Sequence, residues 1–317
     1  MKFRTDLCDL LGIEYPLLQG AMAWIAGGKL AGAVSQAGGL GVIGAGNASD
    51  EIVRKEIQTA RSTTSNPFAV NLMMTSPFIE NIVNLVIQEQ IPIVTTGGGN
   101  PGRYMEQLKQ AGIMVIPVVS SVALARRLIR SGADAFIAEG MESGGHVGEM
   151  TTMGIVPMVI DAVNVPVIAA GGIADGRGFM AALALGAQGV QMGTRFVCAR
   201  ECNVHPAYQQ KLINSRDRST VVCGSSTGHP VRAIHNPFTR IYLNAERSST
   251  SPQELEALGR GRYPSAAVEG DLQEGSILAG QICGLVKAVE SAEDIVLDVI
   301  RDACRVKDAL GGIQCQI

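Results

Sequence analysis

The sequence predicts an α/β protein, a (β/α)8 barrel with a small inserted domain after the eighth strand. Hydrophobic residues make up 46% of the 317 residues and aromatic residues only 4%, a balance typical of proteins with buried parallel strands. Eight short apolar runs follow one another along the first two thirds of the chain. Their starts lie about 20 to 32 residues apart, which is the spacing of βα units. An open doubly wound sheet would usually stop at five or six strands.

The predicted elements can be placed in order along the chain. Strands are expected to begin near Pro16, Gly41, Phe68, Ile93, Val115, Ala135, Val167 and Gly189. Capping residues and apolar periods predict intervening helices that open at 47–50 and at 100–101, the second ending at Gly112. Two further helices are expected over 121–129 and 178–185, the second ending at Gly186.

The pattern changes after the eighth strand. Residues 202–270 are more polar and show no clear strand alternation, whereas 276–286 and 292–310 return to helical periodicity. We therefore expect the barrel to consist of residues 1–201 and 271–317, and a small substrate-facing domain to consist of residues 202–270.

Charge and composition exclude several classes of function. The net charge of −3 provides no electrostatic reason to bind nucleic acid or an anionic membrane, and the few aromatic residues argue against a stacking platform for single strands. Charges interrupt every apolar run near the start, so neither a signal peptide nor a membrane span is expected. We expect a cytoplasmic protein.

The cysteines indicate neither disulfides nor a metal site. There are seven, an odd number without a Cys-x-x-Cys pair: Cys8, Cys198, Cys202, Cys223, Cys283, Cys304 and Cys315. Cys198 and Cys202 are interpreted as small core or half-buried residues, because no histidine or acid has a spacing that would activate a thiol.

One histidine lies in a glycine-rich segment, residues 138–148, directly after an apolar run. Histidine titrates near neutral pH, and the small residues around His146 would let a large planar ligand approach a proton donor or acceptor. We interpret the segment as a mobile active-site loop. A surface turn whose histidine has no role is the alternative.

Polar and glycine residues follow several predicted strands. In a (β/α)8 barrel the carboxyl ends of the strands form the active site, so these residues should converge. The set comprises residues 19–22, 44–46, Asn71, 96–100, Glu139, Gly171, Gly172 and 191–194. Gly171 and Gly172 follow strand seven, and Gly193 and Thr194 follow strand eight. Loops at these two places commonly bind phosphate, although each could be a tight turn only.

Two literal Gly-x-Gly-x-x-Gly matches do not indicate a dinucleotide fold. The match at 39–44 runs into a strand instead of following one. The match at 97–102 contains Pro101 and lacks a suitably placed acidic residue downstream. A nicotinamide cofactor, if used, would bind in another way.

Five motifs fall in order on the predicted strand ends and the histidine loop. They are Gln-Gly-Ala-Met-Ala-Trp at 19–24, Gly-Gly-Leu-Gly at 38–41, Ser-Gly-Gly-His at 143–146, Ala-Ala-Gly-Gly-Ile at 169–173 and Gln-Met-Gly-Thr-Arg-Phe at 191–196. Together they resemble the nitronate monooxygenase superfamily of flavin barrels. Glu-Gly-Met-Glu at 139–142, Thr-Thr-Met at 151–153, His-Pro at 205–206 and Val-Arg-Ala-Ile at 231–234 resemble its flavin-dependent enoyl-acyl-carrier-protein reductase II branch.

The resemblance implies FMN as the cofactor. Its phosphate would bind at Gly171, Gly172, Gly193 and Thr194, its ring would lie against Ala21 and Met22, and Asn71, Glu139 and Gln191 would belong to its polar shell. His146 takes the position of the family's catalytic histidine. The motif residues that complete the expected cofactor set are Gln19, Gly20, Ser143, Gly144, Gly145, Ala170 and Met192.

The resemblance also implies a reaction. NADH or NADPH would reduce the flavin, and a trans-2-enoyl thioester on acyl carrier protein would then accept hydride in the last step of bacterial fatty-acid elongation. Nitronate monooxygenase is the alternative within the fold, and a binding or regulatory barrel without turnover is an alternative of another class. A homodimer is expected.

A local basic excess suits an acidic carrier. Between Arg195 and Arg240 there are seven basic residues and two acidic ones, an excess of +5. We expect this stretch to steer the carrier protein, although scattered solvated charge is the simpler interpretation of any single arginine.

Overall fold

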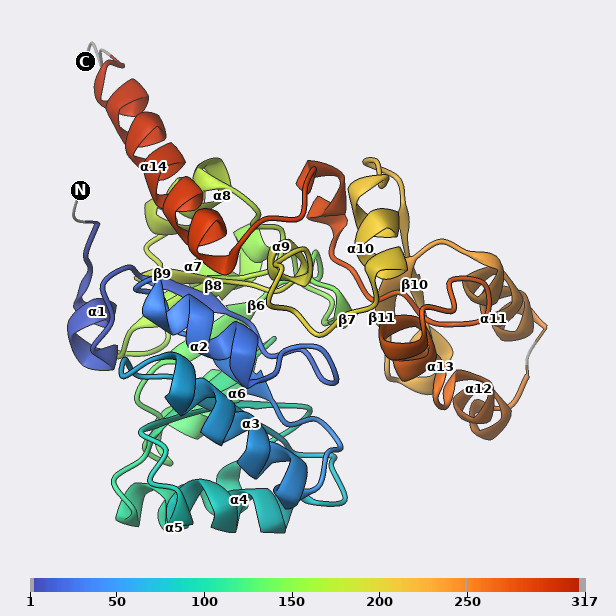
Figure 1. Cartoon of the computed structure of the whole chain (residues 1–317), viewed down its shortest axis with the longest axis horizontal. Helices are drawn as coiled ribbons and strands as arrows, with labels where there is room; N and C mark the ends of the chain where they lie inside the picture. The colour runs from blue at the N-terminus through green and yellow to red at the C-terminus, as the bar shows by residue number, and fades with distance from the viewer. Residues whose placement is uncertain (1–2, 249, 314–317) are drawn as a thin grey trace.

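The computed structural model describes residues 3–248 and 250–313. Eight parallel strands form one sheet in the order β1-β9-β8-β6-β5-β4-β3-β2, which curls into a nearly closed barrel (Figure 1). The strands are β1 (Leu17–Gln19), β2 (Val42–Gly44), β3 (Ala69–Met73), β4 (Ile93–Gly97), β5 (Met114–Val119), β6 (Phe136–Glu139), β8 (Val167–Ala170) and β9 (Gly189–Met192). The predicted barrel is confirmed, and each of these strands begins within one residue of its predicted start.

The barrel closes between β1 and β2 through a short set of contacts. Leu18 forms a parallel bridge with Leu40, and the Gln19 N–H donates to the Leu40 carbonyl at 3.0 Å. The fully buried Gln19 side chain extends the closure. Its Nε2 donates to the Val42 carbonyl and its Oε1 accepts from the Val42 N–H, both at 3.1 Å. This side-chain amide takes the place of backbone hydrogen bonds that the short β1 cannot form with β2.

Side chains alternate between two hydrophobic cores. Leu18, Val42 and Ile93 belong to the core inside the barrel, which is closed at one end by Leu7 and Leu11 of α1 (Asp6–Leu11). Neighbouring residues on the same strands belong to the larger core between the strands and the outer helices. The interior is therefore packed, and room for a ligand is confined to the ends of the barrel.

Helices cover the outside of the barrel. They are α2 (Gly28–Gln36), α3 (Asp50–Thr63), α4 (Ile79–Gln88), α5 (Gly102–Gln110), α6 (Val122–Ile129), α7 (Thr152–Ile160), α8 (Gly176–Ala184) and α14 (Ala292–Gly311). The predicted helix that opens at 47–50 and those over 100–112, 121–129, 178–185 and 292–310 all occur, with ends shifted by up to a few residues. α14 packs against α2 and α8, so it takes the place of the eighth barrel helix (Figure 1).

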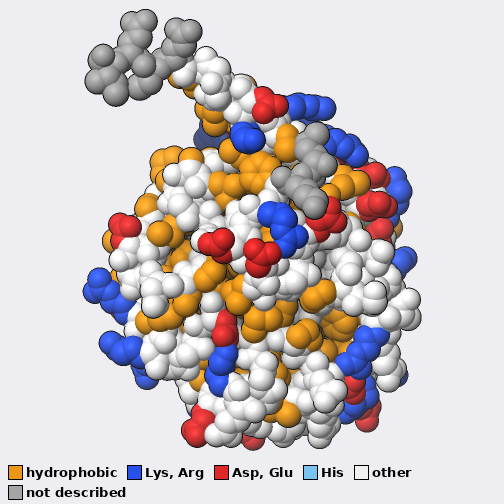
Figure 2. Space-filling model, turned by 90° about the vertical axis from the view of Figure 1, so that its left-hand side faces the viewer, with side chains coloured by type: hydrophobic (Ala, Val, Ile, Leu, Met, Phe, Trp, Pro, Cys, Tyr) orange, Lys and Arg blue, Asp and Glu red, His pale blue; other side chains and the backbone are white. Residues whose placement is uncertain are grey.

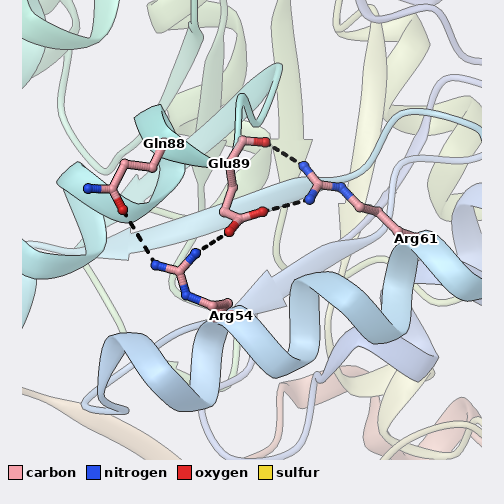
Figure 3. A network of polar contacts seen from close by, with 4 residues as sticks. All are labelled: Arg54, Arg61, Gln88 and Glu89. Carbon is pink, nitrogen blue, oxygen red and sulfur yellow. Dashed lines mark hydrogen bonds and ion pairs between the residues drawn. The ribbon is translucent and has the colours of Figure 1, made fainter.

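Ion pairs join neighbouring outer helices. Glu89, directly after α4, accepts hydrogen bonds from both Arg54 and Arg61 of α3, and Arg61 Nη1 lies 2.6 Å from Glu89 Oε2 (Figure 3). Arg54 also donates to Gln88 at 3.4 Å. One carboxylate shared by two guanidinium groups fixes α3 against α4 on the barrel surface.

The segment between β9 and α14 forms a second body of structure beside the barrel (Figure 1). Its elements are α9 (Thr194–Val197), α10 (Pro206–Ile213), β10 (Thr220–Cys223), η1 (Ser225–Thr227), β11 (Val231–Ile234), α11 (Pro237–Arg247), α12 (Pro252–Gly259), α13 (Arg262–Pro264), η2 (Ser265–Glu269) and η3 (Gln281–Leu285). β10 and β11 are antiparallel, and β7 (Gly145–His146) from the barrel adds a third strand to their sheet. The proposed limits of the small domain, residues 202–270, stay a prediction.

Two parts of this segment differ from what the sequence pattern indicates. The sequence shows no clear strand alternation within 202–270, but β10 and β11 form a hairpin there. Each strand has only four residues, and neither has a regular alternation of buried and exposed side chains. Residues 276–286 were expected to be helical throughout. Instead Leu278 bridges Ala233, and only the five residues of η3 form a 3₁₀ helix.

Within residues 3–248 and 250–313, no helix combines the length and the apolar character that crossing a bilayer requires.

Substitution of Gln19 by methionine should lower the free energy of unfolding by roughly 2–4 kcal/mol. Methionine preserves the volume but leaves the buried N–H and C=O of Val42 without partners. Urea unfolding followed by circular dichroism measures the change. The control is Gln107→Met, which removes an exposed amide contact to Asn84 and should change stability by less than about 0.5 kcal/mol. Equal stability of the two variants would contradict this account of barrel closure.

Candidate functional site

A cavity of about 320 Å³ opens at the carboxyl ends of the barrel strands. It is lined by all but one of the residues of the expected catalytic and cofactor set: Gly20, Ala21, Met22, Asn71, Glu139, Ser143, Gly144, Gly145, His146, Ala170, Gly171, Gly172, Gln191, Met192, Gly193 and Thr194. Of the other strand-end residues expected to converge, Gly97 and Gly98 line the cavity, whereas residues 44–46, 96, 99 and 100 do not. The structure thus brings together residues of the expected set from the ends of five barrel strands, β1, β3, β6, β8 and β9, and from the histidine loop. Their individual roles toward a ligand stay predictions.

Gln19 is the residue of the expected cofactor set that does not line the cavity. Its amide is fully buried and engaged by the backbone of Gly20 and Val42. The side chain therefore supports the turn at 20–22 from behind. Any effect of Gln19 on a bound ligand would pass through the position of that turn.

One corner of the cavity carries free backbone donors. The N–H groups of Gly171, Gly172, Gly193 and Thr194 donate to no described residue. Gly171 and Gly172 have positive φ angles of 92° and 71°, and a Cβ on Gly171 would lie 2.8 Å from the Gly140 carbonyl oxygen. Thr194 Oγ1 accepts from Gly280 N at 2.9 Å and keeps its own proton to donate. Such a group of donors fits a phosphate or another anion.

Glu139 ends β6 and faces the same cavity. Burial raises the pKa of its carboxyl to about 7, and the nearby Ser143 hydroxyl offsets part of that shift. Ser143 Oγ is itself buried and makes no well-aligned hydrogen bond within residues 3–248 and 250–313. Both groups therefore have hydrogen-bonding capacity left for a ligand, and Glu139 can donate or accept near neutral pH.

Two amides contribute further polar edges. Asn71 Nδ2 donates to Thr95 Oγ1 at 3.0 Å, which holds the amide at the wall of the cavity. Gln191 lies close to Gly20, where a Cβ would be only 3.1 Å from Gln191 Cδ. Gly20 is therefore needed for the approach of this side chain, and the two amides can bind the polar rim of a ring system.

His146 lies in β7, paired with Val231 of β11. The residue therefore lies in a sheet and not in the expected turn, whereas the mobility of the loop stays a prediction. The side chain is exposed at the cavity wall. Partial desolvation, and secondly the charge of His229, lower the pKa of His146 below its ordinary value. The neutral imidazole therefore predominates at pH 7.

Hydrogen bonds from distant segments fix the loop that carries His146. Arg232 is 4% exposed, and its Nε donates to the Met141 carbonyl at 3.1 Å. The Glu142 carboxylate accepts from the Thr152 N–H at 2.9 and 3.0 Å, and the Glu142 carbonyl accepts from Gln281 N at 2.9 Å. The loop is thus joined to β11, to the start of α7 and to η3.

The site also contains residues that the sequence did not indicate as functional. Tyr263, Leu278 and Ile282 line the cavity from the segment after β9. Burial raises the pKa of Tyr263 well above its ordinary value, so the phenol stays protonated. None of these residues belongs to a local motif. They are far in sequence from the strand ends, so no sequence pattern could assign them to the site.

The cysteines agree with the expected packing role. Cys198 and Cys202 are buried, and burial raises the pKa of each thiol to about 12, which makes both poor nucleophiles. Cys315 lies outside the described residues.

Comparison with known sequences places the chain among flavin-barrel relatives. The family model described as nitronate monooxygenase matches residues 4–83 and 75–302. A probable nitronate monooxygenase from Staphylococcus aureus is 36% identical over 281 residues, with 74% of this chain and 79% of that protein covered. A (3aS,4S,5R,7aS)-5-hydroxy-7a-methyl-1-oxo-octahydro-1H-indene-4-carboxyl-CoA dehydrogenase from Rhodococcus jostii is 29% identical, with 98% and 99% covered.

Solved structures give a closer likeness. FabK from Thermotoga maritima has 48% identity and a TM-score of 0.95, with 98% of this chain and 99% of that chain covered. A nitroalkane oxidase from Streptomyces ansochromogenes has 28% identity and a TM-score of 0.84, with 96% of this chain and 100% of that chain covered. The similarity therefore includes the barrel and the segment after β9.

Substitution of Glu139 by glutamine should raise the free energy of unfolding of the ligand-free protein at pH 8 by on the order of 2 kcal/mol, since solvent in the cavity offsets part of the desolvation. The folded-state pKa of about 7 exceeds the unfolded value of about 4.5, so stability is lost as pH rises through that interval. At pH 5 the gain should therefore be much smaller. Urea unfolding at both pH values tests this.

The control for this measurement is Glu149→Gln, at an exposed position on the same loop. It should have little effect at either pH. A gain for Glu139→Gln that is equal at pH 5 and pH 8 would show that Glu139 has an ordinary pKa.

Proposed function

Because the chain belongs to the nitronate monooxygenase family, whose members are flavin oxidoreductases, we propose that it is an FMN-dependent enoyl-acyl-carrier-protein reductase. It would reduce trans-2-enoyl thioesters with NADH or NADPH. The observation that carries this proposal is the likeness to FabK, an enoyl-acyl-carrier-protein reductase II, which extends over nearly the whole of both chains.

The cavity has the features that FMN requires. The free N–H groups of Gly171, Gly172, Gly193 and Thr194 would hold the phosphate. The ring would lie against Ala21 and Met22, with the amides of Asn71 and Gln191 and the groups of Glu139 and Ser143 at its polar rim. When bound, FMN would supply the redox chemistry, taking hydride from the nicotinamide and passing it to the thioester's β-carbon.

His146 would act on the substrate side of this cavity. Conjugate reduction places negative charge on the thioester oxygen, so a hydrogen-bond donor there stabilises the transition state more than the ground state. The neutral imidazole can donate its N–H to that oxygen. To deliver a proton to the α-carbon, the ring would first take up a second proton from solvent and then return to the neutral form. Its backbone pairing to β11 keeps the ring at the cavity wall.

A nitronate monooxygenase is the second candidate. The relatives from staphylococci are named probable nitronate monooxygenases, and the same imidazole could take a proton from a carbon atom next to a nitro group. The two reactions differ in what reduces and what reoxidises the flavin, so one kinetic experiment can separate them.

Anaerobic stopped-flow measurement of the flavin absorbance provides that experiment. We expect NADH or NADPH to reduce the protein and crotonyl thioester to reoxidise it rapidly, with much slower reoxidation by oxygen. His146→Ala should slow reoxidation by the thioester about 10²- to 10⁴-fold while leaving reduction by nicotinamide intact. His235→Ala, at an exposed position beyond β11, is the control and should behave as wild type.

Flavin reduction by alkyl nitronate, with reoxidation by oxygen only and no reduction by nicotinamide, would instead assign the monooxygenase activity. Unchanged reoxidation by the thioester in His146→Ala would remove His146 from the mechanism.

Substitution of Gly193 by alanine should weaken FMN binding by roughly tenfold or more, on the order of 1–3 kcal/mol. The backbone at Gly193 has φ −100°, so alanine introduces no strain, and the nearest atom to the added methyl is Met22 Sδ at 3.8 Å. The methyl would occupy space at the expected phosphate. Fluorescence titration of ligand-free protein with FMN measures the affinity.

Gly311→Ala, where an added Cβ has no atom within 4 Å, is the matched control and should retain wild-type affinity. Wild-type FMN affinity in Gly193→Ala would argue against a phosphate at this corner.

A further inference from the structure

A small surface of mixed character surrounds η3. Leu285 is 49% exposed, and Lys287 follows it in an exposed position. Arg216 and Arg218, both exposed, lie on the turn that follows α10, and Lys211 lies on α10 itself. We name this group of five residues the η3 patch: Lys211, Arg216, Arg218, Leu285 and Lys287.

Backbone contacts hold the parts of the η3 patch together. A Cβ on Gly284 would lie 3.0 Å from the carbonyl carbon of Arg216, so η3 packs directly on the turn. That turn is closed by Arg216 N donating to Ser219 Oγ at 2.8 Å and by Ser219 N donating to the Arg216 carbonyl at 3.2 Å. Figure 1 shows η3, in dark red, beside α10. The charges therefore have a defined arrangement.

The basic groups of the η3 patch are free to bind a partner. Within residues 3–248 and 250–313, none of its four cationic side chains forms an ion pair. Asp217 is the acidic residue between the two arginines, so the patch with this turn carries a net charge of +3.

Other basic residues of the run from 195 to 240 have internal roles. Arg195 pairs with Glu290 at 2.5 Å, and Arg232 is buried. At the opposite end of the barrel, the surface in Figure 2 mixes both charge signs. Only some of the basic residues between 195 and 240 are therefore exposed and unpaired among the described residues, and so able to contact a partner protein.

The η3 patch adjoins the proposed active site. Gly280 and Ile282 line the cavity, and Gln281 N donates to the Glu142 carbonyl on the histidine loop. Ile282 and Leu285 are one 3₁₀ turn apart, about 6 Å along the helix axis. A partner seated on the η3 patch would therefore hold a flexible thioester arm close to the cavity.

We propose that the η3 patch is the docking surface for the acyl carrier protein. Free cations around one exposed leucine complement a partner that presents acidic side chains around an apolar residue. The η3 patch is small and lies beside the cavity, so it suits a carrier that must deliver its acyl arm there. This assignment rests on the proposed reductase function.

The test compares two thioesters with wild type and two charge-reversal variants. The patch variant is R216E/R218E/K287E. The control is R126E/R127E/R130E, which makes the same change in charge at exposed positions in the second half of α6 and just after it, at the opposite end of the barrel. Substrates are crotonyl-acyl carrier protein and the neutral crotonyl-N-acetylcysteamine, assayed at two salt concentrations.

We expect the patch variant to raise the KM for the carrier substrate tenfold or more, with kcat changed less than twofold and the neutral thioester unaffected. The control variant should match wild type. High salt should raise the wild-type KM for the carrier and have little effect on the patch variant. Leu285→Ser changes one exposed side chain and should raise the KM for the carrier substrate severalfold. This variant provides the test if the triple variant does not fold.

An unchanged carrier KM in both the patch variant and Leu285→Ser would overturn the docking assignment while leaving the reductase function in place. Wild type that reduces neither thioester would overturn the reductase function, and the docking assignment with it.

Discussion

The contact between Arg232 and the Met141 carbonyl, together with the pairing of β7 with β11, determines the geometry of the site. These hydrogen bonds join the longest barrel loop to the sheet that forms after β9. A buried guanidinium is stable only where acceptors surround it, so Arg232 fixes both the loop and its own strand. Without this contact, the glycines next to His146 would leave the position of its side chain undefined.

A second constraint concerns the other side of the cavity. Backbone N–H groups lose their sheet partners where the chain leaves a parallel strand. In most such turns these N–H groups find acceptors nearby, at the start of the following helix. At Gly171 and Gly172 the positive φ angles direct the chain so that the N–H groups stay free. The same region is closed from outside by Thr194 and Gly280. The barrel therefore provides a set of free N–H donors at one side of the cavity, whereas the imidazole of His146 comes from a loop held by another sheet.

The two halves of the site differ in how far the sequence predicts them. Buried parallel strands are short apolar runs bounded by glycine and polar residues, so their starts could be placed within one residue. The rule that strand ends converge then brings Asn71, Glu139 and Gln191 together. Gln19 shows the limit of that rule, since whether its amide faces the ligand or Val42 depends on barrel closure. The glycine-rich segment indicates His146 as a site residue, but its pairing with β11 depends on a contact between distant segments, as does the position of Tyr263 in the cavity. No local sequence pattern records such contacts.

The cavity is lined partly by the barrel and partly by the segment after β9, and this explains how relatives with different names can share one fold. The expected cofactor contacts come almost entirely from the barrel strands, but Tyr263, Leu278 and Ile282 come from the segment after β9. Changes in that segment can reshape its side of the cavity and the exposed rim without disturbing the corner that carries the free N–H donors. A nitroalkane oxidase, a coenzyme A thioester dehydrogenase and FabK can thus resemble one chain over nearly its full length. Among relatives, we then expect substrate specificity to correlate with the identities of residues 263–287 and of the η3 patch more closely than with overall sequence identity.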